Sequence, residues 1–440
     1  MIDYDARCAR ALDQALAHVP AYRSWRTFDP GMTAPIEQRF RALPALTKEL
    51  MNLHAPAAFV PAGQAVEHGL AEGEVEIVTT SGSTEDKVEN LWYQPWWDRS
   101  ERASWQLNAQ ARRVATGTHR EAILVSPLNV GIRSERALPM EARRLGRFLY
   151  LNEFVDPLAW PESHFRRMLE ELAIFRPAVL EANPSFLARV CRFATRAGVR
   201  PFQPALITLT YEFPSLLHRR QIREVFDAPV VSSYGTTEAG YVFMECERGQ
   251  MHQNTECCRV DFLPLAAEYA SRGLGKLLIT TFDNPWRSLI RFDGGDLGRL
   301  AEGLCPCGRG EGLTLSSVEG RTVNLTTTPA GKLITQAEVD RFLAGVEGLD
   351  EYQLRQADER SYTLKVVTED EGRVMPQAER ALRECYGPEA RIEVSPVGAL
   401  GPEASGKFRL VRASSVLDSM SYVEPGFRPP LPPELRPRDE

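Results

Sequence analysis

The segment P-V-V-S-S-Y-G-T-T-E-A-G, residues 229–240, joins a short β-branched run to a turn of small, hydroxyl and acidic residues. The apolar run predicts a strand over 229–233. Ligands of parallel sheets bind at the carboxyl ends of the strands, which is where residues 234–238 would lie. There an aromatic ring could stack on a base, a glycine would allow close approach, hydroxyls could bind phosphate and the carboxylate could hold Mg²⁺. The segment therefore favours a nucleotide site at a sheet edge.

The surrounding sequence predicts that this strand belongs to an α/β sheet. Between residues 121 and 300, short apolar runs alternate with helical stretches, which is the pattern of βαβ units. Upstream, the sequence predicts a helix from Asp98 to Val114, and residues 5–53 are expected to be helical. In the alternating region we expect strands at 122–125, 148–150, 178–180 and 205–209, and helices near 162–174, 184–197 and 216–226.

The sequence pattern changes near Gly320-Arg321, which predicts a second, smaller folding unit beyond this point. We expect this unit to contain strands near 352–356 and 361–368, a helix near 375–386 and a strand at 390–395. The predicted fold class is α/β: a large N-terminal domain with mixed or parallel sheets and helices, plus a small mobile α+β C-terminal domain. The two domains would cover residues 1–320 and 321–418. A proline-rich tail over 419–440, with six prolines in the last sixteen residues, is expected to be extended or mobile.

Length and composition narrow the classes of function. A chain of 440 residues exceeds one ordinary core, so two folding units are expected. The formal net charge of -7 gives no basic surface for nucleic acid or an anionic membrane, and no run approaches the length of a membrane span. The eight cysteines are spread too unevenly for a disulfide framework, and the first residues lack an apolar signal region. We therefore expect a soluble, cytoplasmic protein without a nucleic-acid or membrane partner.

A second hydroxyl-rich segment, T-T-S-G-S-T-E-D-K over residues 79–87, follows the apolar alternation V-E-I-V at 75–78. Five hydroxyl residues surround one glycine, and a lysine lies close by. Such a loop offers hydrogen-bond donors and a mobile cation to phosphoryl oxygens. By composition alone, a run of this kind is more often a surface turn. The residues predicted to bind phosphate here are Ser81, Gly82, Ser83, Thr84 and Lys87.

Further blocks follow in order. Residues 290–298, I-R-F-D-G-G-D-L-G, carry paired aspartates that would also suit an acidic hairpin turn. Residues 318–321, V-E-G-R, lie at the predicted boundary, and 331–339 read G-K-L-I-T-Q-A-E-V. Residues 403–409, E-A-S-G-K-F-R, place a lysine near the carboxyl end, although an isolated S-G-K would be an ordinary solvent loop. Residues 43–48, L-P-A-L-T-K, are sufficiently explained by a threonine that caps a helix.

Taken in this order, the blocks resemble those of the adenylate-forming superfamily, and most nearly its phenylacetate-CoA ligase-like branch. Residues 234–238 match the family's Y-G-x-[ST]-E block, and 290–298 resemble its Y-R-T-G-D-L block. The segment 318–321 resembles the G-R-x-D hinge, 331–339 resembles the segment that follows the hinge, 403–409 resembles the P-x-x-x-S-G-K block, and 43–48 resembles P-L-T-K. The resemblance runs from about Leu43 to Arg412.

The resemblance implies a two-step reaction with ATP and Mg²⁺. A carboxylate attacks the α-phosphate, pyrophosphate leaves, and a thiol, usually that of coenzyme A, takes the acyl group from the acyl-AMP. Lys407, Glu238 and Arg321 would be catalytic, with Glu238 holding Mg²⁺. The floor of the acid pocket would include Asn129, Gly131, Tyr211 and Glu212. Besides the phosphate loop named above, the nucleotide would be bound by Tyr234, Gly235, Thr236, Thr237 and Asp296, the last through both ribose hydroxyls.

The substrate and the acceptor stay open. Four of the seven tryptophans fall between residues 92 and 105, where they could line a pocket for a small aromatic acid or belong to the core. The acceptor would be coenzyme A or, alternatively, a carrier-protein thiol or an amine, and a nucleotide-binding relative without activity is a third interpretation. Three departures from the family pattern bear on these alternatives. Glu85 stands where glycine is preferred, Lys87 lies one place off the usual lysine, and Val323 occupies the position of the hinge aspartate.

A cysteine and histidine pattern predicts a separate metal site. Cys246 and His252 lie in C-E-R-G-Q-M-H, and Cys305 and Cys307 lie in C-P-C-G, a tight turn that lets two sulfurs reach one ion. One imidazole and three thiolates would hold zinc in a tetrahedral, structural site without an open position. The alternative is that these thiols are small core residues, and the pair Cys257-Cys258 competes as a source of ligands.

Overall fold

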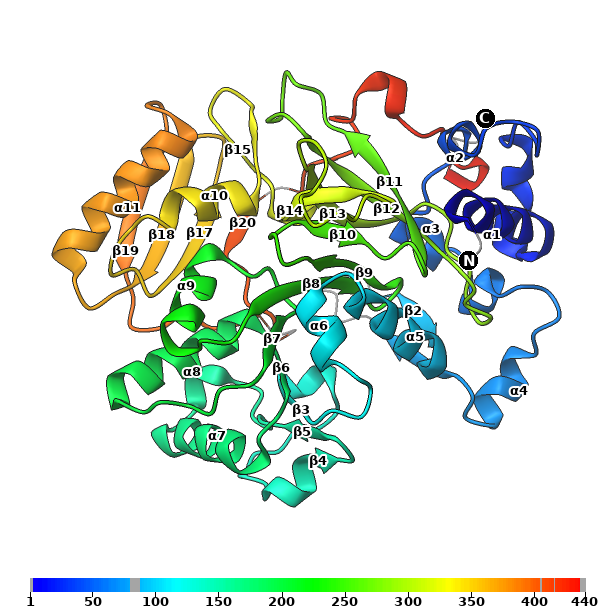
Figure 1. The fold of residues 1–440 in the computed structure, drawn as a ribbon. Coiled ribbons are helices and arrows are strands. Elements are labelled where there is room, and N and C mark those ends of the chain that lie inside the picture. Colours follow the sequence, from blue (N-terminus) through cyan, green and yellow to red (C-terminus); the bar gives the residue numbers. More distant parts are fainter. Residues whose placement is uncertain (1–2, 80–87, 404–405, 415, 436–440) are drawn as a thin grey trace.

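The computed structural model describes residues 3–79, 88–403, 406–414 and 416–435. A twelve-stranded sheet dominates the fold, in the order β11-β12-β13-β14-β10-β9-β8-β7-β6-β3-β5-β4 (Figure 1). One half is parallel, and its strands are β3 (Glu121–Leu124), β5 (Phe148–Tyr150), β6 (Val179–Ala182), β7 (Leu206–Leu209) and β8 (Val230–Thr236). The strand β4 (Arg144–Leu145) lies antiparallel at the edge beside β5.

The other half of the sheet is antiparallel and begins where β8 turns into β9. Its strands are β9 (Gly240–Glu245), β10 (Met251–Gln253), β11 (Cys258–Pro264), β12 (Leu274–Thr281), β13 (Phe292–Leu300) and β14 (Thr314–Arg321). The strand β8 is therefore the junction of the two halves, because it pairs in parallel with β7 and antiparallel with β9. The predicted α/β class with mixed and parallel strands is confirmed.

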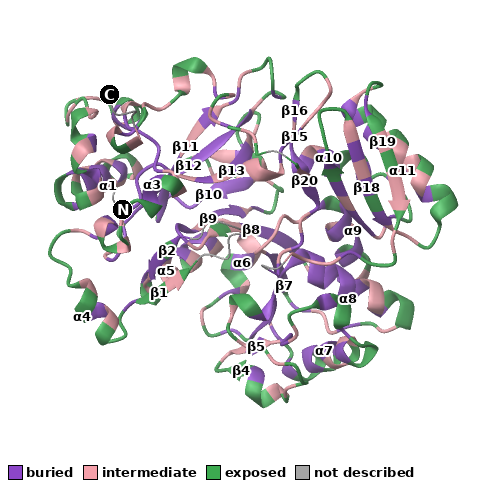
Figure 2. Cartoon of the chain, turned by 180° about the vertical axis from the view of Figure 1, so that it is seen from behind, coloured by how far each residue is buried: buried purple, intermediate pink, exposed green. Residues whose placement is uncertain are grey.

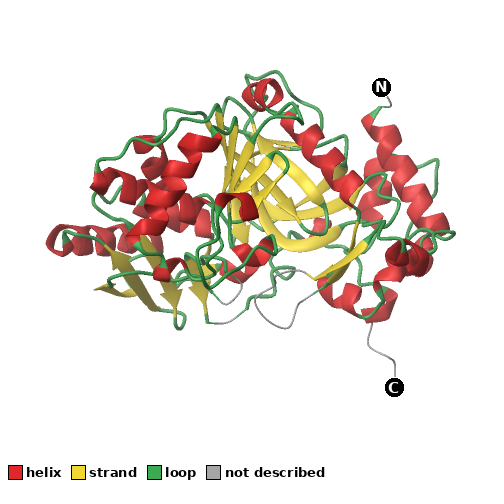
Figure 3. Ribbon diagram, turned by 90° about the horizontal axis from the view of Figure 1, so that it is seen from below, coloured by secondary structure: helices red, strands yellow, loops and turns green. Residues whose placement is uncertain are grey.

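Helices cover both faces of the sheet, as Figure 3 shows. On one face of the parallel half, α7 (Glu162–Phe175), α8 (Pro184–Ala197) and α9 (Leu216–Val225) bury a large apolar cluster. On the other face lie α5 (Gln94–Trp105) and α6 (Ala109–Val114). The three helices predicted between 162 and 226 are confirmed within one residue of their ends.

The predicted helix from Asp98 to Val114 is wrong in its bounds. The segment forms two helices, because Asn108 accepts hydrogen bonds from Gln110 N and Ala111 N, at 2.8 and 3.0 Å, and so caps a new helix. An asparagine at that position satisfies amides that a continuous helix would bond elsewhere. The Asn108 amide also donates to Glu245 O of β9 at 2.9 Å, which fixes the break against the sheet.

The N-terminal segment is built from short helices that cover the antiparallel half of the sheet, where the core is one continuous apolar cluster. They are α1 (Tyr4–His18), η1 (Pro20–Thr27), α2 (Ile36–Ala42), α3 (Lys48–Asn52), η2 (Pro56–Phe59) and α4 (Val66–Ala71). A separate hairpin pairs β1 (Glu76–Thr79) with β2 (Glu89–Trp92). Short η helices in the connections are η3 (Pro127–Asn129), η4 (Met140–Arg143), η5 (Pro157–Ala159) and η6 (Thr322–Asn324).

Beyond β14 the chain forms a second, four-stranded sheet in the order β19-β18-β17-β20. Its elements are α10 (Gln336–Leu343), β17 (Glu351–Gln356), β18 (Ser361–Val367), α11 (Glu371–Tyr386), β19 (Arg391–Pro396) and β20 (Val411–Ala413), preceded by the small pair β15 (Thr326–Thr327) and β16 (Leu333–Ile334). Figure 2 shows buried residues between these strands and α11. The helix begins earlier than the expected residue 375, because Asp370 caps it by accepting from Arg373 N. The boundary at 320/321 stays a proposal.

The end of the chain is extended, but it packs back onto the large sheet. Val423 is fully buried and forms a bridge with Leu265, and Phe427 lies beneath the Arg41 guanidinium. Two short helices, η7 (Pro425–Phe427) and η8 (Pro433–Leu435), complete this segment. Apolar residues between the prolines account for the docking, which a reading of proline content alone does not predict. None of the helices in the described part of the chain is both long and apolar enough to cross a bilayer.

Candidate active site

The ends of β13 and β14 place a carboxylate opposite a guanidinium. Asp296 and Arg321 are direct partners in the antiparallel ladder, and Arg321 also donates to Gly294 O at 3.1 Å. The expected alternative, an acidic hairpin turn at D-G-G-D, is not what forms, because these residues lie inside β13. Asp293 has the structural role there: it pairs with Lys276 at 2.9 Å. Asp296 has no such ion pair with the residues that the structure describes.

The turn after β8 brings the aromatic ring and the second carboxylate to the same place. Ala239 N donates to Thr236 Oγ1 at 3.0 Å, which closes a tight turn and holds Glu238 in a buried position. Only glycine fits at residue 235, because a Cβ there would lie 2.5 Å from Gly240 O. Thr237 lies half-buried in the turn. The sequence block 234–238 is therefore one compact unit at the junction of the sheet's two halves.

Burial shapes the electrostatics of this unit. Burial raises the pKa of Asp296, while the charges of Arg321 and Lys48 and the neighbouring Tyr234 hydroxyl oppose that rise. The Tyr234 hydroxyl is buried beside the Asp296 carboxylate, and its pKa is raised well above its ordinary value, first by burial and then by Asp296. A carboxylate has several lone pairs, so Asp296 can accept further hydrogen bonds from a ligand. These groups therefore suit a polar ligand.

Lys407 enters the site from the small C-terminal sheet. The charges that act on its ammonium are those of Arg321, Glu212, Asp296 and Glu238, and burial lowers its pKa. The loop around it is fixed in place, because Phe408 N donates to the Glu212 carboxylate and Glu403 N donates to Lys407 O at 2.9 Å. The structure thus brings Lys407, Arg321, Asp296 and Glu238 together from four separate segments.

Two further cations lie at this site that the sequence analysis did not assign to it. Lys48 Nζ lies 3.9 Å from Glu238 Oε1. Arg287 is buried, its Nη2 has no partner among the residues described, and burial lowers its pKa to about 10 against the opposing charge of Glu238. Thr47 does cap α3, accepting from Leu50 N at 3.2 Å, and the same cap aims Lys48 at Glu238. The only signal in the sequence for the role of Lys48 was its position directly after the capping residue Thr47.

The four residues expected at the pocket floor are in two groups. Tyr211, at φ 71, donates from its hydroxyl to Glu181, and Glu212 accepts from Ser185 Oγ at 2.9 Å as well as from Phe408 N. Asn129 and Gly131 instead lie exposed at the end of η3. This loop still faces the Lys407 segment, because a Cβ on Gly406 would clash with Ser126.

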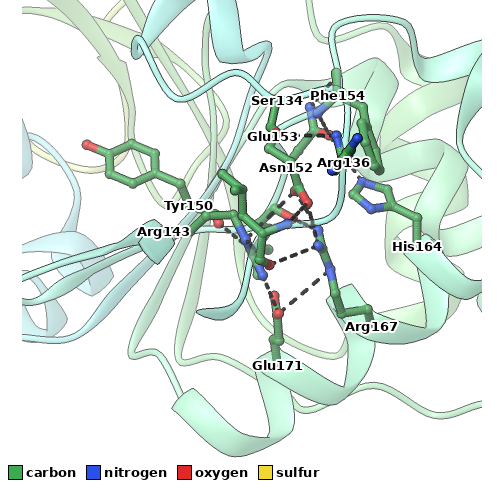
Figure 4. A network of polar contacts seen from close by, with 12 residues as sticks. Ser134, Arg136, Arg143, Tyr150, Asn152, Glu153, Phe154, His164, Arg167 and Glu171 are labelled. Carbon is green, nitrogen blue, oxygen red and sulfur yellow. Dashed lines mark hydrogen bonds and ion pairs between the residues drawn. The ribbon is translucent and has the colours of Figure 1, made fainter. Parts of the chain in front are cut away.

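A buried polar network anchors the loop that carries Asn129 and Gly131 (Figure 4). Glu153 accepts from Leu138 N at 3.0 Å and pairs with Arg167, and Arg143 pairs with Glu171. Asn152 donates to Val125 O at 3.2 Å, directly before the loop. Arginines that satisfy several carbonyls and carboxylates at once make this a rigid base for residues 126–138.

A row of aromatic rings lies near the β8–β9 turn. Trp92 and Trp97 have ring centroids 4.2 Å apart, and Trp97 and Tyr241 are 5.2 Å apart. Tyr241 pairs with Gly235 in the ladder, so the row reaches the candidate nucleotide unit. The predicted phosphate-loop residues Ser81, Gly82, Ser83, Thr84 and Lys87, together with Glu85, lie outside the described residues, between β1 and β2.

Comparison with solved structures identifies the fold. The 2-hydroxyisobutyryl-CoA ligase in its postadenylation state, in complex with R3-HIB-AMP, is similar with a TM-score of 0.68 at 17% identity, covering 93% of this chain and 89% of that one. The chain has the adenylate-forming fold. Neither the family models nor the curated proteins that were searched give a match. The predicted superfamily fold is thus confirmed, whereas the phenylacetate-CoA ligase-like branch stays a prediction.

The likeness depends on the conformation of the solved structure. The open conformation of the same ligase, with 2-HIB-AMP and CoA, gives a TM-score of 0.55 at 17% identity, covering 94% of this chain and 90% of that one. Its thioesterification state gives 0.54 at 18% identity, covering 93% and 88%. The chain is therefore more similar in overall structure to the postadenylation state of that ligase than to its open or thioesterification states.

The cysteine and histidine residues predicted to bind zinc come together between β9, β10 and the 305–308 turn. Their ligand atoms, from Cys246, His252, Cys305 and Cys307, all lie within 4.8 Å of one another. Cys246 Sγ and Cys305 Sγ are 3.7 Å apart, and Cys307 Sγ is 3.2 Å from His252 Nε2. The donor set fits tetrahedral zinc. Cys257 and Cys258 are fully buried and do not belong to this group.

Proposed function

We propose that this chain is an AMP-forming acid–thiol ligase. It would activate a small carboxylic acid as the acyl-AMP, with ATP and Mg²⁺, and transfer the acyl group to the thiol of coenzyme A. The observation that carries the proposal is the convergence of Lys407, Arg321, Asp296 and Glu238 on one point at a sheet edge. The solved CoA ligases with the same fold support the same class of reaction for this chain.

Each of these residues has a chemical role in the proposal. Asp296 accepts hydrogen bonds from the ribose hydroxyls, beside the buried Tyr234 hydroxyl. Lys407 and Arg321 place positive charge where negative charge spreads over the α-phosphoryl oxygens during attack by the carboxylate. Bound Mg²⁺ would supply charge neutralisation for the phosphates, and Glu238 is the carboxylate that would hold it. Gly235, Thr236 and Thr237 would line the nucleotide. Its phosphates would be bound by Ser81, Gly82, Ser83, Thr84 and Lys87.

An aromatic acid is the substrate class that we propose. The row formed by Trp92, Trp97 and Tyr241 supports this choice, because these tilted aromatic rings offer an apolar surface next to the candidate acyl-AMP site. A carrier-protein thiol or an amine is the alternative acceptor. We propose a cytoplasmic location.

The test is ATP–pyrophosphate exchange over a panel of aromatic and aliphatic carboxylic acids, followed by addition of coenzyme A. Exchange with a subset of the acids is expected, and thioester should form when coenzyme A is added. Exchange that needs a carrier protein or an amine for product formation would select the alternative acceptor. If the protein binds ATP but shows no exchange with any acid, the proposed enzyme activity would be wrong. The chain would then be a nucleotide-binding relative without activity.

We also propose that Cys246, His252, Cys305 and Cys307 hold one structural zinc. Thr314 Oγ1 lies 3.4 Å from His252 Nδ1 and could orient the imidazole. The ion would join β9 and β10 to the turn that leads into β14, the strand that ends at Arg321. With four protein ligands, the ion has no open position for substrate, so its expected contribution is to stability.

A further inference from the structure

A second cluster of side chains that could bind a metal ion lies against the large sheet. The carboxylates of Glu101, Glu121 and Glu181, from α5, β3 and β6, each offer an oxygen, and these oxygens all lie within 4.8 Å of one another. They line an enclosed cavity of about 10 Å³ between the sheet and α5. That volume is the space of one small ligand such as an ion or a water molecule.

The charge in this cavity is poorly balanced. Arg147 Nη1 pairs with Glu121 Oε2 at 2.9 Å, and within the described ranges no other arginine or lysine forms an ion pair with the three carboxylates. His119 Nε2 lies 3.2 Å from the same oxygen. Burial, followed by the neighbouring carboxylates, raises the pKa of Glu181 well above its usual value, and burial raises that of Glu101 to about 8. A buried group of this kind is stabilised by a proton or by a bound cation.

A separate observation indicates a ligand. Ser233 is 8% exposed and lines the same cavity, and its hydroxyl has no hydrogen-bond partner in the part of the chain that the structure describes. Buried hydroxyls in folded proteins nearly always have a partner. Thr208, on the neighbouring strand, lines the cavity as well. The cavity is thus lined by three carboxylates and by one buried hydroxyl that lacks a partner among the residues described.

We propose that this cavity binds one hard divalent cation of the size of Mn²⁺ or Ca²⁺, held by Glu101, Glu121, Glu181 and Ser233. All the ligand atoms are oxygens, which such ions prefer over nitrogen and sulfur. Two oxygens bound to one ion at about 2.3–2.5 Å lie at most about 5 Å apart, which matches the spread of the carboxylates. The ion would join α5 to the centre of the parallel sheet. It would lie next to Tyr211 and Tyr241, whose hydroxyls donate to Glu181 and Glu101.

The test uses the full-length protein, freed of metal with a chelator and kept without nucleotide, and titrated with Mn²⁺ while free Mn²⁺ is followed by electron paramagnetic resonance. One Mn²⁺ per chain is expected, with a higher melting temperature, and Ca²⁺ should compete. Glu181→Gln should weaken Mn²⁺ binding by about tenfold or more, the scale seen when a metal site loses a supporting group. Glu238→Gln is the matched control, because it alters the proposed Mg²⁺ residue and should leave this binding unchanged.

Ser233→Ala provides a second variant if Glu181→Gln does not fold, and it should weaken Mn²⁺ several-fold. Wild-type protein that binds neither Mn²⁺ nor Ca²⁺ without nucleotide would overturn the proposal. Equal Mn²⁺ affinity in wild type and Glu181→Gln would do the same, as would a Glu181→Gln variant that is more stable than metal-treated wild type, since the carboxylates would then share protons around a water. The result does not depend on whether the chain is a ligase.

Discussion

The side chain of Lys407 reaches the candidate active site from a loop that Glu212 and Glu403 hold in place. We predict that Lys407→Ala lowers ATP–pyrophosphate exchange by on the order of a hundredfold, because one preorganised positive charge at the phosphoryl group is lost. The folded state should remain, as circular dichroism would show. The control is Lys365→Ala, an exposed lysine on β18 of the same sheet, which should leave exchange unchanged. Near wild-type exchange in Lys407→Ala would refute the role of this loop.

The same lysine predicts an unusual alkaline pH dependence. Its pKa in the folded protein is lowered by burial and by Arg321. Exchange should therefore fall as pH rises through a pKa below 10.5, the ordinary lysine value, since the neutral amine no longer stabilises negative charge. For stability the sign is opposite. The unfolded chain binds this proton more tightly, so Lys407 disfavours folding below its folded pKa, and that cost disappears as pH rises.

The measurement is a pH profile of exchange beside a pH profile of melting temperature. Activity is expected to fall in a range where Lys407 does not reduce stability. Parallel loss of activity and of melting temperature would instead indicate general alkaline unfolding.

Lys48 carries a third prediction at the residue scale. Its ammonium is 3.9 Å from the Glu238 carboxylate and also acts on Asp296. Lys48→Met should lower kcat/KM for ATP by about tenfold, the effect of about 1.4 kcal/mol, because two carboxylates lose a compensating charge beside the phosphates. Lys332→Met is the control, since Lys332 Nζ donates only to Glu268 O at the surface. If the ATP kinetics of Lys48→Met are unchanged, Lys48 has no role in ATP binding and is only the first residue of α3.

At the scale of elements, the four proposed zinc ligands lie where β9 and β10 meet the turn before β14. We predict that purified protein contains close to one zinc per chain and that Cys305→Ala loses both the zinc and several degrees of melting temperature, because ligand binding contributes folding free energy. Cys385→Ala is the matched control: it also removes a buried thiol, but from α11, away from the ligand group. Elemental analysis and thermal melting measure the two effects. If wild-type protein is fully stable without metal, the zinc site is wrong, and the four residues are ordinary core and turn residues.

Element positions were predictable where periodicity and capping agree. The helices α7, α8 and α9 follow from regular apolar spacing and from caps such as Asn183 and Ser215, which accept from amides in the first turn of α8 and α9. The break between α5 and α6 was missed because Asn108 can sit within a helix or cap one, and its long-range bond to Glu245 O selects the cap. The local sequence therefore does not determine whether Asn108 continues the helix or caps a new one.

At the scale of the whole molecule, the small C-terminal sheet is held against α8 by buried ion pairs. Glu351 pairs with Arg189 at 3.0 Å and with Arg192, and Asp340 accepts from Leu216 N at 2.6 Å. If thiol transfer requires this sheet to rotate, the rotation would have to break these contacts.

We predict that Glu351→Gln lowers the rate of acyl-AMP formation several-fold and raises the rate of thiol transfer from preformed acyl-AMP, because Arg189 and Arg192 lose their partner and the present arrangement is destabilised. Glu359→Gln, at an exposed position of the same sheet, is the control. Single-turnover kinetics of each half-reaction would measure the change. Equal slowing of both half-reactions would indicate a general loss of stability rather than a shift between arrangements.

The sequence by itself determined the α/β class, the order of the blocks and the residue types at the nucleotide unit. A β-branched run followed by small and hydroxyl residues forms a strand and a tight turn through local forces, so residues 230–239 needed no distant information. The same holds for Thr47, whose cap was predicted and observed. Ligand sets of defined spacing, such as C-P-C-G, are also local.

Only the tertiary structure decided which charges share a site. Lys48, Arg287, Asp296 and Lys407 lie up to several hundred positions apart, and their mutual distances depend on how two sheets and three loops pack. The acidic cavity of Glu101, Glu121 and Glu181 is likewise invisible in the sequence, since each glutamate alone resembles a solvated surface residue. The hydrophobic effect does not select which polar groups meet, because it has no direction. The register of β3, β6 and β8 and the packing of α5 instead bring these groups within reach of one ligand.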